Sequence, residues 1–255
     1  MSEYGRAGLV GVLPPQSNRT VEAELGVLLE PDVATVVSRL VCRDESARER
    51  LLGYFSNVPA ALASFDTLQP KVTLFACTGS TYLVGLEAED RVFPARNVVS
   101  AARAVLAALD ALEIERMAIV SPYPAWLTEA CAAFWASRGR RLVDVHPLEG
   151  ERDDTRRIYA LTSKDAAAAL TRIRTAGAQA VLLTGTGMPT LAALAGANPA
   201  LPVLSSNFCL GWVAMRRLCD APLDRASLLA WLSPNADWRS RLAARFPSAL
   251  ENSNR

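Results

Sequence analysis

Histidine is nearly absent from the sequence, and this limits the kinds of catalytic site that the chain can build. The one histidine among 255 residues, His146, is followed by Pro147 in what we expect to be a polar loop. A Ser-His-Asp or Cys-His hydrolase needs a histidine held beside its nucleophile. An isolated loop histidine does not suit that role, so the sequence argues against a hydrolase of the triad type.

Cysteine is sparse and irregularly spaced. The five cysteines are odd in number, and no two of them form a C-x-x-C pair. Disulfide frameworks and zinc sites have paired or closely spaced cysteines. We therefore expect neither a disulfide framework nor a zinc site, and the thiols to consider singly are Cys42, Cys77, Cys131, Cys209 and Cys219.

Neither charge nor apolar length points to a nucleic acid or a membrane. The chain has 27 basic and 26 acidic side chains, whereas a surface for nucleic acid or anionic lipid has a basic excess. No uncharged apolar stretch reaches the roughly 18 residues that cross a bilayer. Residues 1–6 lack the pattern of a signal peptide. We expect a cytoplasmic globular protein of one large domain or two of about 100 to 150 residues.

Apolar strands alternate with helical stretches along the chain. The sequence predicts strands at residues 9–13, 35–42, 72–76, 117–120, 141–145, 180–183 and 203–205. It predicts helices at residues 20–29, 47–63, 98–112, 128–137, 164–176, about 212–218 and 225–232. This alternation is typical of βαβ units and predicts an α/β fold with mainly parallel sheets.

One stretch contains the most candidate catalytic and binding groups in the sequence: Val72-Thr-Leu-Phe-Ala-Cys77-Thr-Gly-Ser80. A β-prone run leads into a thiol, a hydroxyl, a glycine and a second hydroxyl, and a helical stretch follows at residues 83–88. On such a strand-to-helix turn the helix dipole lowers a thiol pKa, and the free N–H groups can bind a carboxylate. We expect Cys77 to be a nucleophile or proton donor. The alternative is a buried cysteine that serves as a small apolar residue.

The chain also contains an internal repeat. Pro14 and Pro122 each end a predicted strand and are 108 residues apart, and the same distance separates Cys77 from Gly185. Each half has a strand, a proline stop, a helix and then a strand that enters a Thr/Gly loop. Because ligands of open α/β sheets bind beyond the carboxyl ends of the strands, two facing halves would bring both loops to one cleft.

Four short motifs occur along the chain: Pro14-Pro-Gln-Ser-Asn-Arg-Thr20, Ala76-Cys-Thr-Gly-Ser80, Val120-Ser-Pro-Tyr123 and Gly187-Met-Pro-Thr190. In their order and spacing they resemble the maleate cis-trans isomerase and arylmalonate decarboxylase branch of the aspartate/glutamate racemase superfamily, from Leu9 to about Leu218. The resemblance implies two pseudo-symmetric lobes, each a mainly parallel sheet flanked by helices, with the active site in the cleft between the lobes. It implies no metal and no organic cofactor.

The same resemblance divides the chain and assigns roles to its residues. It implies a first lobe of residues 1–95 with about 205–255, which carries Cys77, and a second lobe of residues 96–204, which carries Gly185. Cys77 matches the nucleophile of the isomerases. The positions that would bind substrate are Asn18, Thr78, Gly79, Ser80, Tyr123, Gly185 and Thr186.

One position departs from the pattern of the family. The second-lobe cysteine, which is an acid or base in two-thiol racemases and the proton donor in the decarboxylases, falls on Gly185 here. Cys209 lies 24 residues later, after the next strand. That position is not catalytic in the family, so we expect a structural role for Cys209.

This glycine restricts the chemistry that we expect. Racemisation normally uses two groups on opposite faces of a carbon. Cis-trans isomerisation needs one thiolate, which adds to the double bond, leaves an enolate and departs after rotation. We expect isomerisation of a maleate-like dicarboxylate first. Decarboxylation of a substituted malonate, racemisation of an amino acid or hydantoin with an unidentified second group, and an inactive homologue that only binds a small carboxylate stay open.

Each catalytic route has to stabilise an enolate. We expect backbone N–H groups of residues 78–80 and of the Thr186 region, with the hydroxyls of Thr78 and Tyr123, to form the oxyanion site. The expected partner is a small carboxylate or dicarboxylate substrate. We expect no nucleic acid and no membrane, and the chain is a candidate for homo-oligomer formation.

Overall fold

Two four-stranded parallel sheets form the framework of the computed structural model, which describes residues 3–93, 97–148, 154–198 and 200–253. The first sheet has the order β2-β1-β3-β4 and the second the order β6-β5-β7-β8, and neighbouring strands pair in parallel. The strands are β1 (Gly8–Leu13), β2 (Val33–Val37), β3 (Val72–Phe75), β4 (Val98–Ser100), β5 (Arg116–Ser121), β6 (Arg141–Pro147), β7 (Ala180–Leu183) and β8 (Val203–Ser205). The predicted two-lobe α/β fold is confirmed.

The two sheets repeat one arrangement at a nearly fixed distance along the chain. β1 and β5 begin at residues 8 and 116, β2 and β6 at residues 33 and 141, and β3 and β7 at residues 72 and 180. Each of these pairs is 108 residues apart, while β4 and β8 begin at residues 98 and 203, 105 residues apart. The repeat in the sequence is thus a repeat of the sheet, so the loops after β3 and β7 occupy corresponding places.

The central strands position these two loops. β3 and β7 lie inside their sheets, and each of their residues is buried. Strands of a parallel sheet that is covered on both faces have nearly continuous apolar sequences, as both strands have here. The loops that carry Cys77 and Gly185 therefore leave from the middle of each lobe.

The histidine lies in a strand. β6 forms one edge of the second sheet, and Val120 of β5 pairs with His146. The expectation of a polar loop at His146 was therefore wrong. An edge strand tolerates polar side chains and a proline at its end, because one side of its backbone needs no ladder partner.

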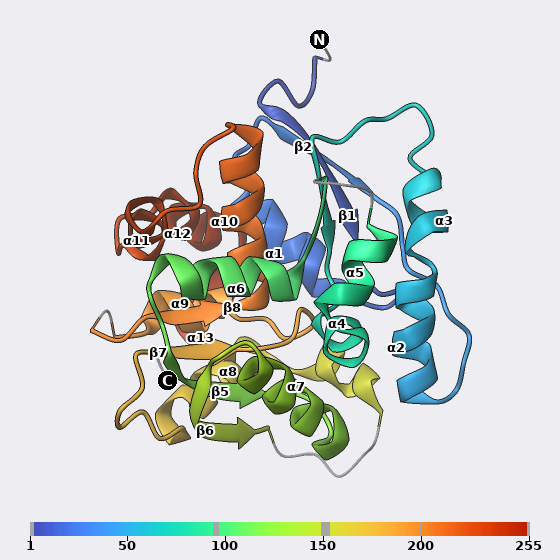
Figure 1. Ribbon diagram of the computed structural model, residues 1–255. Helices are drawn as coiled ribbons and strands as arrows, with labels where there is room; N and C mark the ends of the chain where they lie inside the picture. Colours follow the sequence, from blue (N-terminus) through green and yellow to red (C-terminus); the bar gives the residue numbers. More distant parts are fainter. Residues whose placement is uncertain (1–2, 94–96, 149–153, 199, 254–255) are drawn as a thin grey trace.

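Helices cover both faces of each sheet (Figure 1). They are α1 (Thr20–Leu28), α2 (Ala47–Ser56), α3 (Val58–Ala63), α4 (Thr78–Val84), α5 (Leu86–Val92), α6 (Ala101–Ala111), α7 (Ala125–Ser137), the 3₁₀ helix η1 (Thr155–Ala160), α8 (Ser163–Arg172), α9 (Leu191–Gly196), α10 (Ser206–Leu218), α11 (Arg225–Leu232), α12 (Asp237–Arg245) and α13 (Pro247–Ser253). In the described part of the chain, no helix has both the length and the apolar character required to cross a bilayer.

Several predicted helices differ from the observed ones, and the one expected at about 212–218, for example, already begins at Ser206. The helix expected at 47–63 is divided at Asn57, and the one at 83–88 becomes α4 and α5, separated by Gly85 with a φ of +77°. The helix expected at 98–112 begins later, because residues 98–100 pair with β3 as β4 and the Ser100 hydroxyl then caps α6. β4 therefore lies in the first sheet, although the predicted lobe boundary at 95–96 precedes it.

The helix α10 joins the two lobes. It follows β8 of the second sheet and packs against α1, α6 and β3 on the side of the first sheet (Figure 1). Nearly all of its residues are buried, including Cys209. The lobes are thus held by a shared core helix.

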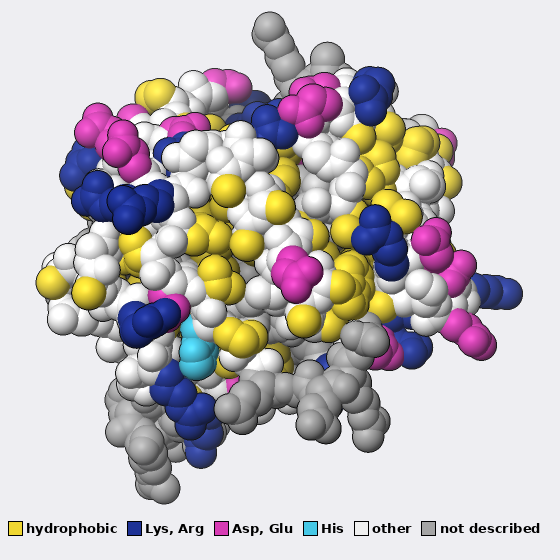
Figure 2. Space-filling model, turned by 60° about the horizontal axis from the view of Figure 1, so that its bottom comes forward, with side chains coloured by type: hydrophobic (Ala, Val, Ile, Leu, Met, Phe, Trp, Pro, Cys, Tyr) yellow, Lys and Arg dark blue, Asp and Glu magenta, His cyan; other side chains and the backbone are white. Residues whose placement is uncertain are grey.

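Charges are mixed over the surface. Figure 2 shows basic and acidic side chains spread over one face, with both signs near one another. Several charged side chains of the molecule form ion pairs, for example Arg140 with Asp110 and Arg174 with Asp144. Among the described side chains on this face, the basic ones do not form a continuous field of the kind that attracts nucleic acid.

Candidate active site

A cavity of about 30 Å³ lies between the two lobes, beyond the carboxyl ends of β1, β3, β5 and β7. Its lining is Pro15, Asn18, Leu51, Tyr54, Cys77, Thr78, Gly79, Tyr123, Leu127, Thr155, Arg156, Ile158, Tyr159, Thr186 and Gly187. Most of the site residues predicted from the sequence are in this list. Ser80 and Gly185 are not, but each contacts a residue that is.

The Cys77 thiol is held by a hydrogen-bond chain. Cys77 is 4% exposed and directly precedes α4, and its Sγ lies 3.0 Å from the Ser80 Oγ. The Ser80 hydroxyl donates to the Leu51 carbonyl oxygen at 2.7 Å. Because a hydroxyl has one proton, Ser80 can only accept from Cys77 in this arrangement. The resting sulfur is therefore a neutral thiol that donates to Ser80.

Burial raises the pKa of the Cys77 thiol above its ordinary value. Hydrogen bonds to the thiolate, from the Ser80 hydroxyl once it turns toward the sulfur and from the N–H groups of Ser80 and Gly79, act in the opposite direction but do not outweigh burial. The expected lowering of this pKa by the helix dipole was therefore wrong. The N–H groups are in place, but a charged sulfur would be surrounded by protein instead of water.

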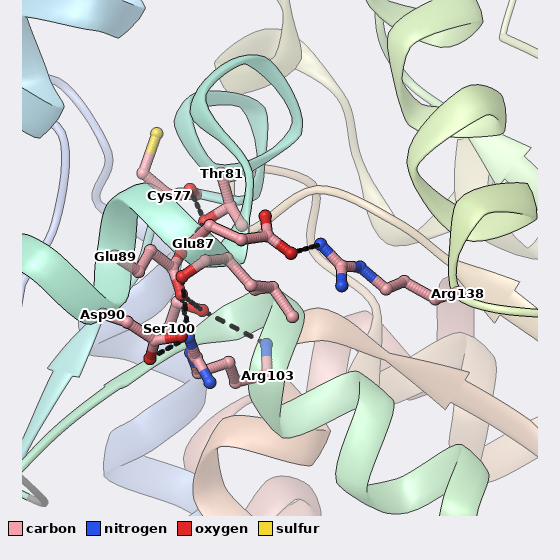
Figure 3. Close-up of polar contacts among 9 residues, drawn as sticks. Cys77, Thr81, Glu87, Glu89, Asp90, Ser100, Arg103 and Arg138 are labelled. Atoms are coloured by element: carbon pink, nitrogen blue, oxygen red, sulfur yellow. Dashed lines mark hydrogen bonds and ion pairs between the residues drawn. The ribbon is translucent and has the colours of Figure 1, made fainter.

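A buried carboxylate supports the cysteine loop from behind. Glu89 of α5 accepts hydrogen bonds from the Thr81 and Ser100 hydroxyls and pairs with Arg103, and the Thr81 hydroxyl also lies 3.4 Å from the Cys77 carbonyl oxygen. Figure 3 shows this network with the Cys77 side chain pointing away from it. Glu89 therefore fixes the backbone of the loop and does not contact the thiol.

Asn18 and Thr186 join the lobes at the cavity. The Asn18 Oδ1 accepts from the N–H groups of Thr20 and Val21 at the start of α1, and its Nδ2 donates to the Thr186 hydroxyl at 3.0 Å. Thr186 in turn donates to the Ala76 carbonyl oxygen. An amide nitrogen has two hydrogens, and the second one on Asn18 has no partner among the described residues. It is available to an oxygen of a ligand.

Tyr123 lies in the cavity wall beside Cys77. Its Oη is 2.5 Å from the Oγ1 of Thr78, and its ring packs edge-on against Tyr82. Burial raises the pKa of Tyr123 well above its ordinary value, against the opposing hydrogen bond from Thr78. The phenol is therefore neutral at neutral pH and can donate a hydrogen bond or a proton.

Gly185 has no room for a side chain. Its φ is +90°, and an added Cβ would lie 2.9 Å from carbon atoms of Ile158 and Pro122. The same Cβ position is 3.3 Å from the Tyr123 Oη. A thiol at this position would displace its neighbours, so the glycine fits both the backbone and the packing.

Sequence reasoning missed the residues that η1 contributes. Arg156 and Tyr159 line the cavity from this short 3₁₀ helix, and Tyr54 lines it from α2. Their one sequence signal is an Asp154 N-cap, whose carboxylate accepts from the Arg156 N–H. Such a cap is common at helix starts and does not indicate a site.

Arg50 anchors η1 to the first lobe. Its side chain is almost fully buried and donates to the Asp44 and Glu45 carbonyl oxygens and, at 2.8 Å, to Asp154. Asp154 also pairs with Arg156. Burial acts to raise the pKa of Asp154, but the hydrogen bonds and positive charge of Arg156 lower it by more. The pKa is therefore below its ordinary value, and the carboxylate stays ionised. This chain of charges places Arg156 at the cavity.

A larger cavity, of about 370 Å³, lies between α1, α9, α12 and α13. Its lining is mostly apolar and includes Glu24, which clamps the lobes by accepting from the N–H groups of Thr190 and Leu191 and from the Asn207 Nδ2. Its described lining contains no cysteine, histidine or tyrosine. Among the described residues, no cluster of three or more histidine, cysteine or acidic side chains is placed to hold a metal ion.

Comparisons with known proteins extend this description. No protein-family model matches the sequence, and no curated protein matches it. Solved structures do match. A cysteine-to-alanine variant of the maleate isomerase from Pseudomonas putida, in complex with maleate, is 22% identical, with 89% of this chain and 98% of the other covered and a TM-score of 0.74.

Two further structures match over similar lengths. A cysteine-to-serine variant of the Nocardia farcinica maleate cis-trans isomerase with a covalently bound succinylcysteine intermediate is 23% identical, covers 84% of this chain and 94% of its own, and has a TM-score of 0.70. An arylmalonate decarboxylase is 20% identical, covers 82% and 92%, and has a TM-score of 0.61. The resemblance to this branch is thus confirmed at the level of the fold.

Proposed function

We propose that this protein is a cofactor-independent enzyme of the aspartate/glutamate racemase superfamily, which isomerises a small cis-dicarboxylate through Cys77. The observation that carries the proposal is a single thiol in an inter-lobe cavity, surrounded by hydrogen-bond donors from both lobes. The structural similarity to maleate isomerases supports it.

The polar groups of the cavity suit a dianion. The free Nδ2 hydrogen of Asn18, the Thr78 and Tyr123 hydroxyl pair and the N–H groups of the loop at 78–80 can bind one carboxylate. Arg156, the one cation in the described lining, can pair with the other. The cavity of about 30 Å³ has room for one or two water molecules, so a four-carbon diacid requires the cavity to widen when it binds.

The proposed reaction needs one sulfur. The Cys77 thiolate adds to one carbon of the double bond, and the electron pair of that bond moves onto the neighbouring carbon and its carboxylate as an enolate. Rotation about the new single bond exchanges the two geometries. The electron pair then reforms the double bond, and the C–S bond breaks to regenerate the thiolate. The hydrogen-bond donors stabilise the enolate.

The Nocardia farcinica protein provides a parallel. It carries a covalently bound succinylcysteine although one of its cysteines has been replaced by serine. A covalent adduct of a cysteine with a four-carbon diacid therefore forms in that protein without its full set of thiols. In this chain Gly185 leaves Cys77 as the one sulfur in the described lining.

A second candidate function is decarboxylation of a substituted malonate. Its specific support is the protonated resting state of Cys77, which donates to Ser80 and whose pKa burial raises. After loss of CO₂ such a thiol would protonate the enediolate once, and Cys77 would act as an acid instead of a nucleophile.

Proton NMR in D₂O tests the proposal. The protein is incubated in turn with maleate, phenylmalonate and aspartate. We expect fumarate from maleate and no change in the other two acids. Deuterated phenylacetate from phenylmalonate would instead support the decarboxylase, and deuterium at the α-carbon of aspartate a racemase. Binding of maleate without turnover would indicate a homologue that only binds carboxylates, and would contradict the proposal.

A further inference from the structure

The cavity contains few groups that can transfer a proton to carbon. Its described lining has no carboxyl, imidazole or amine group. Apart from Cys77 and the permanently charged Arg156, the titratable side chains in it are Tyr54, Tyr123 and Tyr159. Any second acid or base contributed by this lining must therefore be a tyrosine.

Tyr123 is the tyrosine whose hydroxyl is oriented. Its Oη is held 2.5 Å from the hydroxyl of Thr78, the residue that directly follows Cys77. The hydroxyls of Tyr54 and Tyr159 have no hydrogen bond to a described residue. A proton-transfer group needs a fixed position relative to the reacting atom, and Tyr123 satisfies this condition.

Gly185 gives the Tyr123 hydroxyl access to this part of the cavity wall. The position of an added Cβ at residue 185 is 3.3 Å from the Oη, which is contact distance. A side chain there would cover the hydroxyl. The glycine and the tyrosine therefore act together, because the missing side chain leaves the phenol hydroxyl uncovered.

We propose that Tyr123 donates a proton to the substrate carbon next to the one that Cys77 attacks, and later removes a proton from that carbon. This role rests on the proposed isomerase function and goes beyond binding of a carboxylate. The thiolate forms the C–S bond, and the Tyr123 O–H proton passes to the adjacent carbon, which leaves a succinyl thioether and a phenolate. After rotation the phenolate takes a proton from the same carbon, the double bond reforms and the thiolate departs.

Burial adjusts Tyr123 to this role. Its raised pKa keeps the phenol protonated until the reaction begins. A carbanion next to a carboxylate is a far stronger base than a phenolate, so proton transfer from the Tyr123 phenol to this carbanion remains energetically favourable. The phenolate formed in the buried cavity is a strong base, which favours its return to the phenol and drives the elimination step.

The stereochemistry gives a direct test in D₂O. If the phenolate removes the deuteron that it has just added, with the same geometry relative to the C–S bond as in the addition, the original cis acid is regenerated. Formation of the trans acid requires loss of the original hydrogen, so fumarate made from maleate should carry deuterium. An enolate that rotates without protonation on carbon would give unlabelled fumarate.

The experiment compares wild type, Tyr123→Phe and Tyr82→Phe with maleate in D₂O, with kcat, KM and the deuterium content of fumarate as readouts. Tyr82 is the control, because it is an equally buried tyrosine in contact with Tyr123 but outside the cavity lining. We expect Tyr123→Phe to lower kcat by about 10²- to 10⁴-fold with little change in KM, and its residual fumarate to be unlabelled. Tyr82→Phe should keep the label.

Four results would overturn the inference. Unlabelled fumarate from the wild type, or label and kcat retained in Tyr123→Phe, removes the proton-transfer role while isomerisation through Cys77 stands. A loss confined to KM in Tyr123→Phe assigns the hydroxyl to binding alone. If the wild type fails to isomerise maleate, the proposed function itself is wrong and the inference fails with it.

Discussion

The Cys77 Sγ lies 3.0 Å from the Ser80 Oγ, and the Ser80 proton is already donated to the Leu51 carbonyl oxygen. The sulfur is therefore a donor at rest. To stabilise a thiolate, Ser80 has to leave Leu51 and turn its proton toward the sulfur. Activation of the thiol thus includes a rotation of one hydroxyl.

Ser80→Ala tests the contribution of this hydroxyl. The Ser80 side chain lowers the thiol pKa against the larger effect of burial, so its removal should raise that pKa further. We expect slower alkylation of Cys77 by iodoacetate at fixed pH, measured by peptide mass spectrometry. The exposed Cys219 in the same sample is the internal control. Equal or faster alkylation of Cys77 would show that Ser80 stabilises only the thiol form.

The pH dependence of turnover separates the two candidate reactions. Addition to a double bond requires the thiolate, and burial raises the pKa of Cys77. The isomerase rate should therefore increase with pH through neutrality and continue to increase beyond the ordinary range of a free thiol. A decarboxylase that uses the thiol as acid would show a rate that is constant at neutral pH and falls at alkaline pH. The pH profile of kcat distinguishes these outcomes.

Gly185→Ala should destabilise the fold. The Cβ would contact Ile158 and Pro122 at 2.9 Å, and the φ of +90° is unfavourable for a side chain. We expect the free energy of unfolding to fall by about 2–4 kcal/mol in urea denaturation. Gly177→Ala is the matched control, because Gly177 has a φ of +81° and no atom within 4 Å of the added Cβ. It should lose only about 1 kcal/mol, and equal losses in both variants would show that packing at residue 185 has no effect.

Arg156→Gln should weaken substrate binding. The side chain lines the cavity, and loss of a charge-assisted hydrogen bond to one carboxylate should raise KM about ten-fold. Arg157→Gln is the control, since Arg157 lies on the same 3₁₀ helix but is not part of the cavity lining. Steady-state kinetics with maleate measure both. A similar KM in the two variants would remove Arg156 from the site.

Glu24→Ala should weaken the contact between the two lobes. It would leave the N–H groups of Thr190 and Leu191 and the Asn207 amide without their acceptor in a buried place. We expect the free energy of unfolding to fall by about 2–3 kcal/mol, measured by urea denaturation. A loss within experimental error would show that water replaces the carboxylate.

The positions of most strands along the chain and the place of the reactive loop follow from the sequence, because buried parallel strands have distinctive apolar runs and the repeat fixes their correspondence. The short strand β4 was instead predicted as the start of a helix. Asn18, Cys77 and Tyr123 were located through short motifs and lie at one cavity. The ionisation of Cys77 was predicted wrongly, because the turn shows the dipole but not the side chains that cover the sulfur. Arg156 was missed for a related reason. Its position depends on Arg50, which is distant in sequence.

The most direct test of the account compares Cys77→Ala with Cys209→Ala. Cys209 is a fully buried thiol outside the cavity, so its variant controls for loss of a cysteine from the core. With maleate as substrate and fumarate followed by proton NMR, we expect Cys77→Ala to lose turnover and Cys209→Ala to retain most of it. Fumarate formation by Cys77→Ala at the rate of the wild type would contradict the account.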